Sequence, residues 1–307
     1  MTTRHFGSLS VELSREDKTL FPDACITKGN LIEYYQDVAG PILRHIGGRP
    51  LTLQRFPDGI SEEGFYQKAV PDYFPDWISR VQVPLEQGGS QQQVEASNAA
   101  TLVFLANQGV ITLHGWLSRK DRLREPDQIV FDLDPPGEDF SPVREAARIL
   151  QDLLESLGLR SFLMTTGSTG AHVRVPIRQG PDFDEVREFA GGVVSLLADE
   201  HEGSLTTRIR KKKRQNRLFL DVARNAYGQT AVAPYSPRPR PGAPVATPLD
   251  WEELDKANLT SDFFTIESIP RRLGQRKDPW VSMGRHQRSL DGPRERLEKL
   301  RKGSSNA

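Results

Sequence analysis

The chain has 307 residues, of which 36% are hydrophobic, so it can fill the core of one large globular domain or of two smaller ones. Its 41 basic and 41 acidic residues balance, so the total charge does not mark it as a nucleic-acid binder. A single cysteine, Cys25, excludes a disulfide framework and a zinc site of several thiolates, and the lack of a secretory signal or of an apolar run of about 18 residues predicts a cytoplasmic protein without a membrane partner.

The first third of the chain is predicted to begin with a helix and to continue with strands. The helix covers about Thr27 to Gly40, with Thr27 as its N-cap and apolar residues at helical spacing. The segments LTLQRF and GFYQKAV favour strands. Further along, Gln87–Gln93 (QGGSQQQ) has no hydrophobic periodicity, so we expect an exposed loop there.

From Gln128 onward, strands alternate with helices, which predicts an α/β fold class. The segments IVFDLD, SFLMTT, HVRVPI and RLFLD are expected to be strands. The first helix among them is expected to be capped by Ser141 and ended by Gly158. The second should start near Asp182, with Glu185 completing a capping box.

Proline and charge characterise the remaining segments. Pro234–Pro248 contains six prolines and is expected to wrap the surface as an extended arm. Arg208–Arg217 is strongly basic, and the last basic residues, ending KGSSNA, favour a helix that frays into a tail. We expect residues 1–110 to form an N-terminal subdomain, 111–260 a central core and 261–307 a basic helical tail, together one compact domain.

Two acidic side chains leave the end of the strand IVFDLD on the same face. Asp132 and Asp134 are two residues apart, whereas Phe131 and Leu133 point to the other face. Two carboxylates held roughly 6 to 7 Å apart repel each other unless a cation lies between them, and their hard oxygen atoms favour magnesium or manganese over zinc. Asp221, at the end of RLFLD, is the best candidate for a third ligand. The alternative is a plain D-x-D turn that caps a helix or solvates a strand end.

A glycine-rich turn lies between two of the predicted strands. Thr166–His172 (TGSTGAH) contains two glycines and three hydroxyl residues, and the backbone N–H groups of such a turn can face an anion. His172 and Arg174 share one face of the strand that follows. A plain hairpin is the alternative for the turn, and a structural role is the alternative for His172.

Taken together, these segments resemble the primase-polymerase domain of bacterial ligase D, within the archaeo-eukaryotic primase superfamily. The resemblance covers roughly residues 10 to 255 and rests on motifs in the same order: EDKTLFPDACITKGNLIEYYQDVA, GRPLTLQRFPDGISEEGFYQK, ITLHGWLSR, VFDLDPPGEDF, TTGSTGAHVRVP and LFLDVARNAYGQTAVAPYSPRPRPGAPVATPLDWEEL. It implies mixed central sheets with packed helices around a primase-like catalytic core. It also implies a metal-dependent nucleotidyltransferase that adds nucleotides, preferably ribonucleotides, to DNA ends and gaps.

The resemblance assigns roles to individual residues. It implies that two divalent ions, Mn²⁺ or Mg²⁺, are held by three catalytic carboxylates, Asp132, Asp134 and Asp221. It implies that the nucleoside triphosphate contacts Ser168, His172, Arg214 and Arg238, and that the nucleotide pocket is also lined by His114 and Arg224. In the N-terminal subdomain, Lys18 and Lys28 would bind a DNA 5′-phosphate. The position of Lys28 beside a helix N-terminus suits an anion, although a solvated surface charge is the alternative for both lysines.

Two positions depart from the family pattern. Thr169 and Gln54 stand where the family usually has lysine, and both changes should weaken the grip on the triphosphate. Arg55 and Arg174 lie close by in sequence and are candidates to replace the lost charges. Arg55 is therefore included among the candidate nucleotide-binding residues.

The resemblance also implies a place in DNA repair. The expected reaction is nucleotide addition during non-homologous end joining or gap repair, in a cytoplasmic, nucleoid-associated protein. No ligase motif is visible, so we expect a separate DNA ligase and an end-binding Ku-type protein as partners. Three alternatives stay open: a priming polymerase outside end joining, a DNA-end-binding module without catalysis, and a two-metal nuclease.

Overall fold

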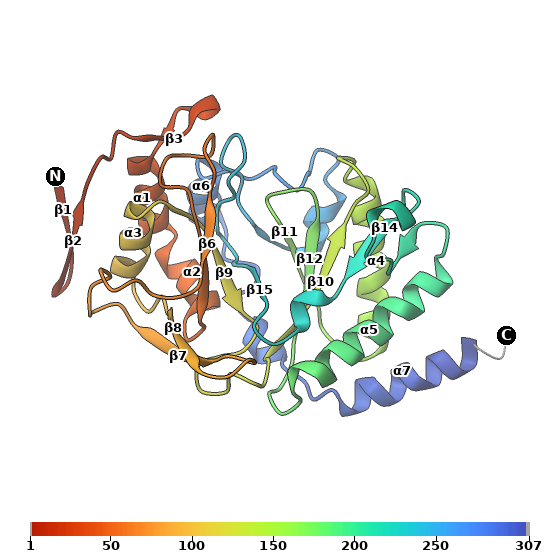
Figure 1. The fold of residues 1–307 in the computed structure, drawn as a ribbon. Coiled ribbons are helices and arrows are strands. Elements are labelled where there is room, and N and C mark those ends of the chain that lie inside the picture. The colour runs from red at the N-terminus through yellow and green to blue at the C-terminus, as the bar shows by residue number, and fades with distance from the viewer. Residues whose placement is uncertain (1, 305–307) are drawn as a thin grey trace. The chain divides into compact units, whose positions relative to one another are not determined.

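The computed structural model describes residues 2–304 and divides into two compact units, each discontinuous in the chain (Figure 1). Unit 1 comprises the chain up to Trp116 together with Thr230–Thr247 and Asp262–Asp278. Unit 2 comprises Leu117–Gln229, Pro248–Ser261 and the chain from Pro279 on. These units differ from the three continuous ranges expected from the sequence, because pairing between distant strands leaves no trace in local composition.

Unit 1 is built on a six-stranded sheet with the order β15-β9-β5-β8-β7, in which β6 also pairs with β5. Its strands are β5 (Leu51–Arg55), β6 (Phe65–Gln67), β7 (Arg80–Pro84), β8 (Ser90–Val94), β9 (Val110–Trp116) and β15 (Thr230–Val232). Two small hairpins are formed by β1 (Thr2–Phe6) with β2 (Leu9–Leu13) and by β3 (Thr19–Phe21) with β4 (Ile26–Thr27). The helices are η1 (Pro22–Ala24), α1 (Lys28–Asp37), α2 (Ala39–Ile46), α3 (Ala99–Asn107) and α6 (Ser268–Gln275).

The N-cap predicted for the first helix is confirmed. The Thr27 side chain accepts a hydrogen bond from the Asn30 N–H, and the Asn30 side chain accepts one from the Thr27 N–H. These two bonds satisfy amide groups that the first turn of a helix leaves without partners. The helix buries Leu31, Ile32, Tyr34 and Tyr35.

The prediction that Gln87–Gln93 forms an exposed loop is wrong for most of its length. A turn with positive φ at Gly88 and Gly89 leads into β8, which pairs antiparallel with β7. Backbone pairing needs no apolar side chains, and the buried Gln93 accepts a hydrogen bond from the Trp116 indole at 3.0 Å. The strand was missed because most of its side chains are polar, so they show no hydrophobic alternation.

Unit 2 is an α/β unit with a mixed six-stranded sheet, ordered β13-β14-β10-β12-β11-β16, which confirms the predicted fold class. Its strands are β10 (Gln128–Asp134), β11 (Phe162–Thr165), β12 (Ala171–Pro176), β13 (Leu205–Thr206), β14 (Leu218–Asp221) and β16 (Pro248–Leu249). Its helices are α4 (Ser141–Ser156), α5 (Phe183–Glu200), α7 (Asp291–Ser304) and the short η2 (Lys211–Lys213), η3 (Ala223–Asn225), η4 (Trp251–Asp255) and η5 (Met283–His286).

The two long helices of unit 2 begin differently. The capping box predicted for α5 is confirmed, because Asp182 and Glu185 each accept the other's backbone N–H at 2.9 Å. The cap predicted for α4 is one residue off: the helix starts at Ser141, and the Ser141 N–H donates to Asp139 Oδ1. Asp139 thus binds the amide of the first helical residue, whereas the N-cap residue is Phe140, whose side chain makes no capping hydrogen bond.

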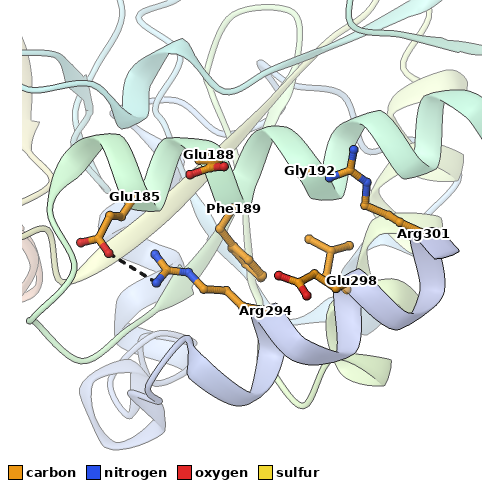
Figure 2. A pocket seen from close by; sticks show the side chains of 8 residues that line it. Glu185, Glu188, Phe189, Gly192, Arg294, Glu298 and Arg301 are labelled. Carbon is orange, nitrogen blue, oxygen red and sulfur yellow. Dashed lines mark ion pairs between the residues drawn. The ribbon is translucent and has the colours of Figure 1, made fainter.

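Helix α7 packs against α5 and extends to Ser304. Figure 2 shows Arg294 reaching toward Glu185, with 3.5 Å between their charged atoms. Leu297 approaches Gly192 so closely that a Cβ at Gly192 would lie 3.1 Å from it. The end of the expected frayed tail, residues 305–307, lies outside the described residues.

Most of the proline-rich segment is buried, so the expectation of an arm on the surface is wrong outside residues 238–242, which are partly or fully exposed. Tyr235, Ser236 and Val245 are fully buried in unit 1. The Tyr34 hydroxyl donates to the Tyr235 carbonyl at 2.8 Å, and the Thr112 hydroxyl donates to the Pro237 carbonyl at 2.7 Å. Hydroxyl donors from other elements therefore satisfy a backbone that forms little regular structure of its own.

Candidate functional site

Three aspartates lie on one face of the unit 2 sheet, at neighbouring strand ends. Asp132 and Asp134 end β10, and Asp221 ends β14. The two strands are antiparallel, with Asp132 directly opposite Asp221, and residues directly opposite each other point to the same face. The strand pairing thus brings together carboxylates that are far apart in the sequence.

The three acids affect each other's protonation. Burial, followed by the charges of Asp132 and Asp221, raises the pKa of Asp134 to about 6, although Arg214 and Arg224 oppose the shift. Burial is the largest cause of this shift, and repulsion from the two neighbouring carboxylates adds to it.

Basic and donor groups already contact part of the cluster. His172, directly opposite Asp132 on β12, places its Nε2 3.5 Å from Asp132 Oδ1. Burial lowers the pKa of His172, which favours the neutral imidazole. Arg224 Nε lies 3.8 Å from Asp132 Oδ2, and Asp221 Oδ1 accepts the Ala223 N–H at 2.7 Å.

The donor set of the cluster suits a hard divalent cation. Carboxylate oxygens are the ligands preferred by Mg²⁺ and Mn²⁺, and a cation would relieve the repulsion that raises the pKa of Asp134. Within residues 2–304, no group of three or more Asp, Glu, His or Cys side chains already stands in an arrangement that would hold a metal ion. The aspartates fit such an ion by the chemistry of their oxygen donors.

The glycine-rich turn joins β11 to β12 beside this cluster. Gly170 is pressed against β10: a Cβ there would lie 2.0 Å from the Leu133 carbonyl oxygen, between the two aspartates of that strand. Thr166 closes the turn, since both its N–H and its hydroxyl donate to the Gly170 carbonyl, at 3.1 and 3.0 Å. Only glycine fits at this backbone contact.

The expectation that the turn offers its amides to an anion is wrong for two residues. The Gly167 N–H donates to the Ser261 carbonyl at 3.1 Å, and the Ser168 N–H donates to the Thr166 hydroxyl at 3.3 Å. The partly exposed residues of the turn are Ser168 and Thr169. Their hydroxyl groups are therefore the parts of the turn best suited to meet an anion.

The arginines of unit 2 have distinct surroundings. Arg214 lies 3.9 Å above the Phe219 ring, and Phe219 is directly opposite Asp134. Arg224, on η3, is about half exposed. Arg174 is buried, with its guanidinium 5.6 Å from the centre of the Trp280 ring and 3.2 Å from Gln128 Oε1. Arg174 is thus part of the packed interior of unit 2.

In unit 1, the candidate nucleotide-binding residues lie on the sheet and on the buried proline-rich segment. His114 on β9 is directly opposite Thr52 on β5, and its ring makes an edge contact with Tyr66. Gln54, two residues after Thr52, has a buried Oε1 without a hydrogen-bond partner. Arg238 is anchored through its backbone, because its N–H donates to the Pro244 carbonyl at 2.7 Å.

Arg55 is committed to contacts within unit 1. Its guanidinium donates twice to the Gln108 carbonyl, at 3.1 and 2.9 Å, and also donates to Gln67 and to the Tyr73 hydroxyl. The Gln108 carbonyl ends α3, so Arg55 ties that helix end to the sheet. Arg55 could contact a nucleotide only if it broke some of these hydrogen bonds and formed new ones to the nucleotide.

The two lysines expected at the DNA 5′-phosphate are neighbours in unit 1. The Lys28 N–H donates to the Lys18 carbonyl at 2.8 Å. Lys18 Nζ lies 2.5 Å from Asp58, while Lys28 Nζ donates to the Asn107 carbonyl at 3.3 Å. Burial, followed by the charges of Arg15 and Lys18, lowers the pKa of Lys28, and a bound anion would oppose this shift.

One residue of the site was missed by the sequence analysis. Ser261 is buried and contacts the glycine-rich turn through both its side chain and its carbonyl. It stands 91 positions after Gly170 and beyond the last matching motif, so no local pattern marks it.

Comparison with known proteins matches this geometry to one family. The family described as "LigD, primase-polymerase domain" matches residues 27–280. The multifunctional non-homologous end joining protein LigD of Pseudomonas aeruginosa is 33% identical over 278 residues, which are 90% of this chain and 33% of that protein. The bifunctional LigD of Bacillus subtilis is 31% identical over 272 residues, 88% of this chain and 43% of that protein.

A solved structure agrees with the sequence relatives. The polymerase domain of Mycobacterium tuberculosis ligase D, in complex with DNA, aligns with a TM-score of 0.84 and 29% identity, over 90% of this chain and 98% of that one. The chain spans a third to less than half of the length of the two LigD relatives described above. No helix in the described part of the chain is long and apolar enough to cross a bilayer. The chain belongs to the LigD primase-polymerase domain family.

Proposed function

We propose that the chain is a metal-dependent primase-polymerase that transfers nucleotides from nucleoside triphosphates to the 3′ ends of DNA at gaps and breaks. The observation that carries the proposal is the trio of aspartates on adjacent strand ends, with the glycine-rich turn pressed against the strand that bears two of them. The membership of the chain in a polymerase family supports the same chemistry.

In this proposal Asp132, Asp134 and Asp221 hold the divalent ions. When bound, such ions activate a primer 3′-hydroxyl and neutralise charge on the triphosphate. The neutral His172 beside Asp132 can orient that carboxylate or donate to a phosphate oxygen.

The triphosphate is proposed to bind the hydroxyl side of the turn and nearby cations. In unit 2, the proposed contacts are Ser168, His172, Arg214 and Arg224. The family resemblance also proposes His114 and Arg238 of unit 1 as nucleotide-binding residues, with Arg55 as a weaker candidate because its guanidinium is already bound within that unit. Positioning and charge neutralisation account for most of the catalysis available to such a site.

Lys18 and Lys28 are proposed to bind the 5′-phosphate on the far side of a gap. A phosphate placed between them would restore the charged form of Lys28 that burial disfavours. The solved relative with a TM-score of 0.84 is a polymerase domain in complex with DNA, which supports DNA as the partner.

The proposed biological role is end joining or gap repair, with ribonucleotides as preferred substrates. The LigD relatives are named for non-homologous end joining, which supports this role. A separate DNA ligase and an end-binding Ku-type protein are the proposed partners.

An extension assay tests the proposed function. The substrates are a 5′-phosphorylated gapped duplex, a blunt duplex and an unprimed template, each with Mg²⁺ or Mn²⁺ and with ribo- or deoxyribonucleotides. The proposal predicts metal-dependent filling of the gap, with ribonucleotides favoured. Extension of the unprimed template alone would favour a priming role, binding without extension a non-catalytic end clamp, and strand cleavage a nuclease.

A further inference from the structure

We propose that Ser261 is a positioning residue for nucleotide binding: it holds the turn Thr166–Gly170 in place against the strand that carries Asp132 and Asp134. This inference rests on the proposed function, because it assumes that the turn contacts a nucleoside triphosphate. Ser261 itself is buried, with 3% of its surface exposed, and does not reach a ligand.

Ser261 contacts three residues of the turn through hydrogen-bonding atoms. Its hydroxyl donates to the Gly170 carbonyl at 2.6 Å and lies 3.1 Å from the Thr166 hydroxyl. Its carbonyl accepts the Gly167 N–H at 3.1 Å. The first, second and last residues of the turn are therefore all bonded to one residue from another part of the chain.

The opposite contact of the turn is with the carboxylate strand. Gly170 sits so close to the Leu133 carbonyl that no side chain fits between them. Ser261 binds the carbonyl of the same glycine, so Gly170 is fixed from two directions. The separation between Ser168 and the aspartates on either side of Leu133 depends on this arrangement.

Ser261 is itself rigidly supported. The guanidinium of Arg144, on α4, donates to the carbonyls of Leu254, Ala257 and Leu259, with distances of 3.4 Å to Ala257 and 2.5 Å to Leu259. These carbonyls precede Ser261 on the segment that follows β16. A side chain that orients a binding group must be held by its own surroundings, and this segment meets that requirement.

Loss of the Ser261 hydroxyl should affect placement more than folding. The Gly170 carbonyl would keep both hydrogen bonds from Thr166, so the hairpin would remain closed. The turn would keep the bond from the Gly167 N–H to the Ser261 carbonyl but would lose both contacts of the Ser261 hydroxyl, so it would sample a wider range of positions relative to the aspartates. Nucleotide affinity should fall, whereas DNA binding by the lysines of unit 1 should not.

The test compares Ser261→Ala with Ser118→Ala. Ser118 is fully buried in the same unit and donates to the Leu123 carbonyl at 2.9 Å, so its replacement removes one buried hydroxyl bond away from the turn. Ribonucleotide titrations on a gapped duplex should give a Michaelis constant raised roughly three- to tenfold in Ser261→Ala, with a smaller change in kcat. Ser118→Ala should keep the wild-type Michaelis constant, although its free energy of unfolding in urea should fall about as much as that of Ser261→Ala. Ser261→Cys, with a weak donor of similar size, should fall between wild type and Ser261→Ala.

The outcomes separate this inference from the proposed function. If the wild-type protein fills the gap and Ser261→Ala retains its Michaelis constant, the positioning role is refuted and the polymerase stands. Equal increases in the Michaelis constant for Ser261→Ala and Ser118→Ala would also refute it, because a general loss of stability would explain both. If Ser261→Ala does not fold, Ser261→Cys takes its place in the test. A raised Michaelis constant in Ser261→Cys would support the positioning role, and an unchanged one would refute it. A wild-type protein without metal-dependent incorporation would overturn the proposed function and this inference with it.

Discussion

Replacing Gly170 by alanine should separate the turn from the carboxylate strand. A Cβ at this position would lie 2.0 Å from the Leu133 carbonyl oxygen, whereas real Cβ contacts almost never fall below 3.0 Å. The turn or the strand must therefore move by about 1 Å, the difference between these distances. Displacement of reacting groups by about 1 Å can lower a rate on the order of 100-fold. We therefore expect kcat/KM to fall about 100-fold. The crowding should also lower the free energy of unfolding by about 1 to 3 kcal/mol.

The assay is steady-state nucleotide incorporation at a gap, combined with urea unfolding. Gly191→Ala is the matched control, because Gly191 lies inside α5 with no atom within 4 Å of an added Cβ. Alanine there should stabilise the helix by about 0.5 to 1 kcal/mol without changing kcat/KM. If Gly170→Ala matched wild type in both measurements, the close contact between turn and strand would be refuted.

Three further predictions concern other parts of the protein. Replacing Lys18 and Lys28 by alanine should weaken binding to gapped DNA only when the gap carries a 5′-phosphate; equal losses on both duplexes in a titration would make them general backbone contacts. Thr169→Lys should lower the Michaelis constant for the nucleotide several-fold with little change in kcat. A charge-assisted contact to a phosphate contributes about 1.5 to 3 kcal/mol, and the entropy cost of ordering the lysine side chain offsets part of this gain. An unchanged Michaelis constant would place residue 169 away from the phosphates. Asp278→Asn should cost about 1 to 3 kcal/mol in urea unfolding, because this buried carboxylate accepts hydrogen bonds at 2.7 and 2.9 Å; unchanged stability would contradict that role.

Features decided by neighbouring residues were predictable from the sequence. The N-cap at Thr27 and the capping box at Asp182 depend on residues close together in the sequence, and both are present. The paired aspartates of β10 follow from strand alternation, since Asp132 and Asp134 must share a face. At α4 the N-cap is Phe140 instead of the expected Ser141, and Asp139 accepts the Ser141 N–H.

Features decided by distant contacts were not predictable in the same way. Pro234–Pro248 is buried because hydroxyls of Tyr34 and Thr112 satisfy its carbonyls, and neither donor is near it in the sequence. The register that sets Asp221 opposite Asp132 depends on the pairing of β14 with β10. No local sequence pattern marks Ser261, because its role depends on the segment after β16 lying against the glycine-rich turn, 91 positions earlier in the chain.

The central claim is that the aspartates of unit 2 hold the ions that catalyse nucleotide addition. The most direct measurement is the rate of ribonucleotide addition to a 5′-phosphorylated gap, in Mg²⁺ or Mn²⁺, for wild type, Asp134→Asn and Glu138→Gln. Both substitutions remove one carboxylate charge, but Glu138 is exposed and outside the cluster. Asp134→Asn should bind the gapped DNA normally and add nucleotides at less than about a tenth of the wild-type rate, while Glu138→Gln should be unaffected. An Asp134→Asn protein that kept more than about a tenth of the wild-type rate would contradict the metal assignment.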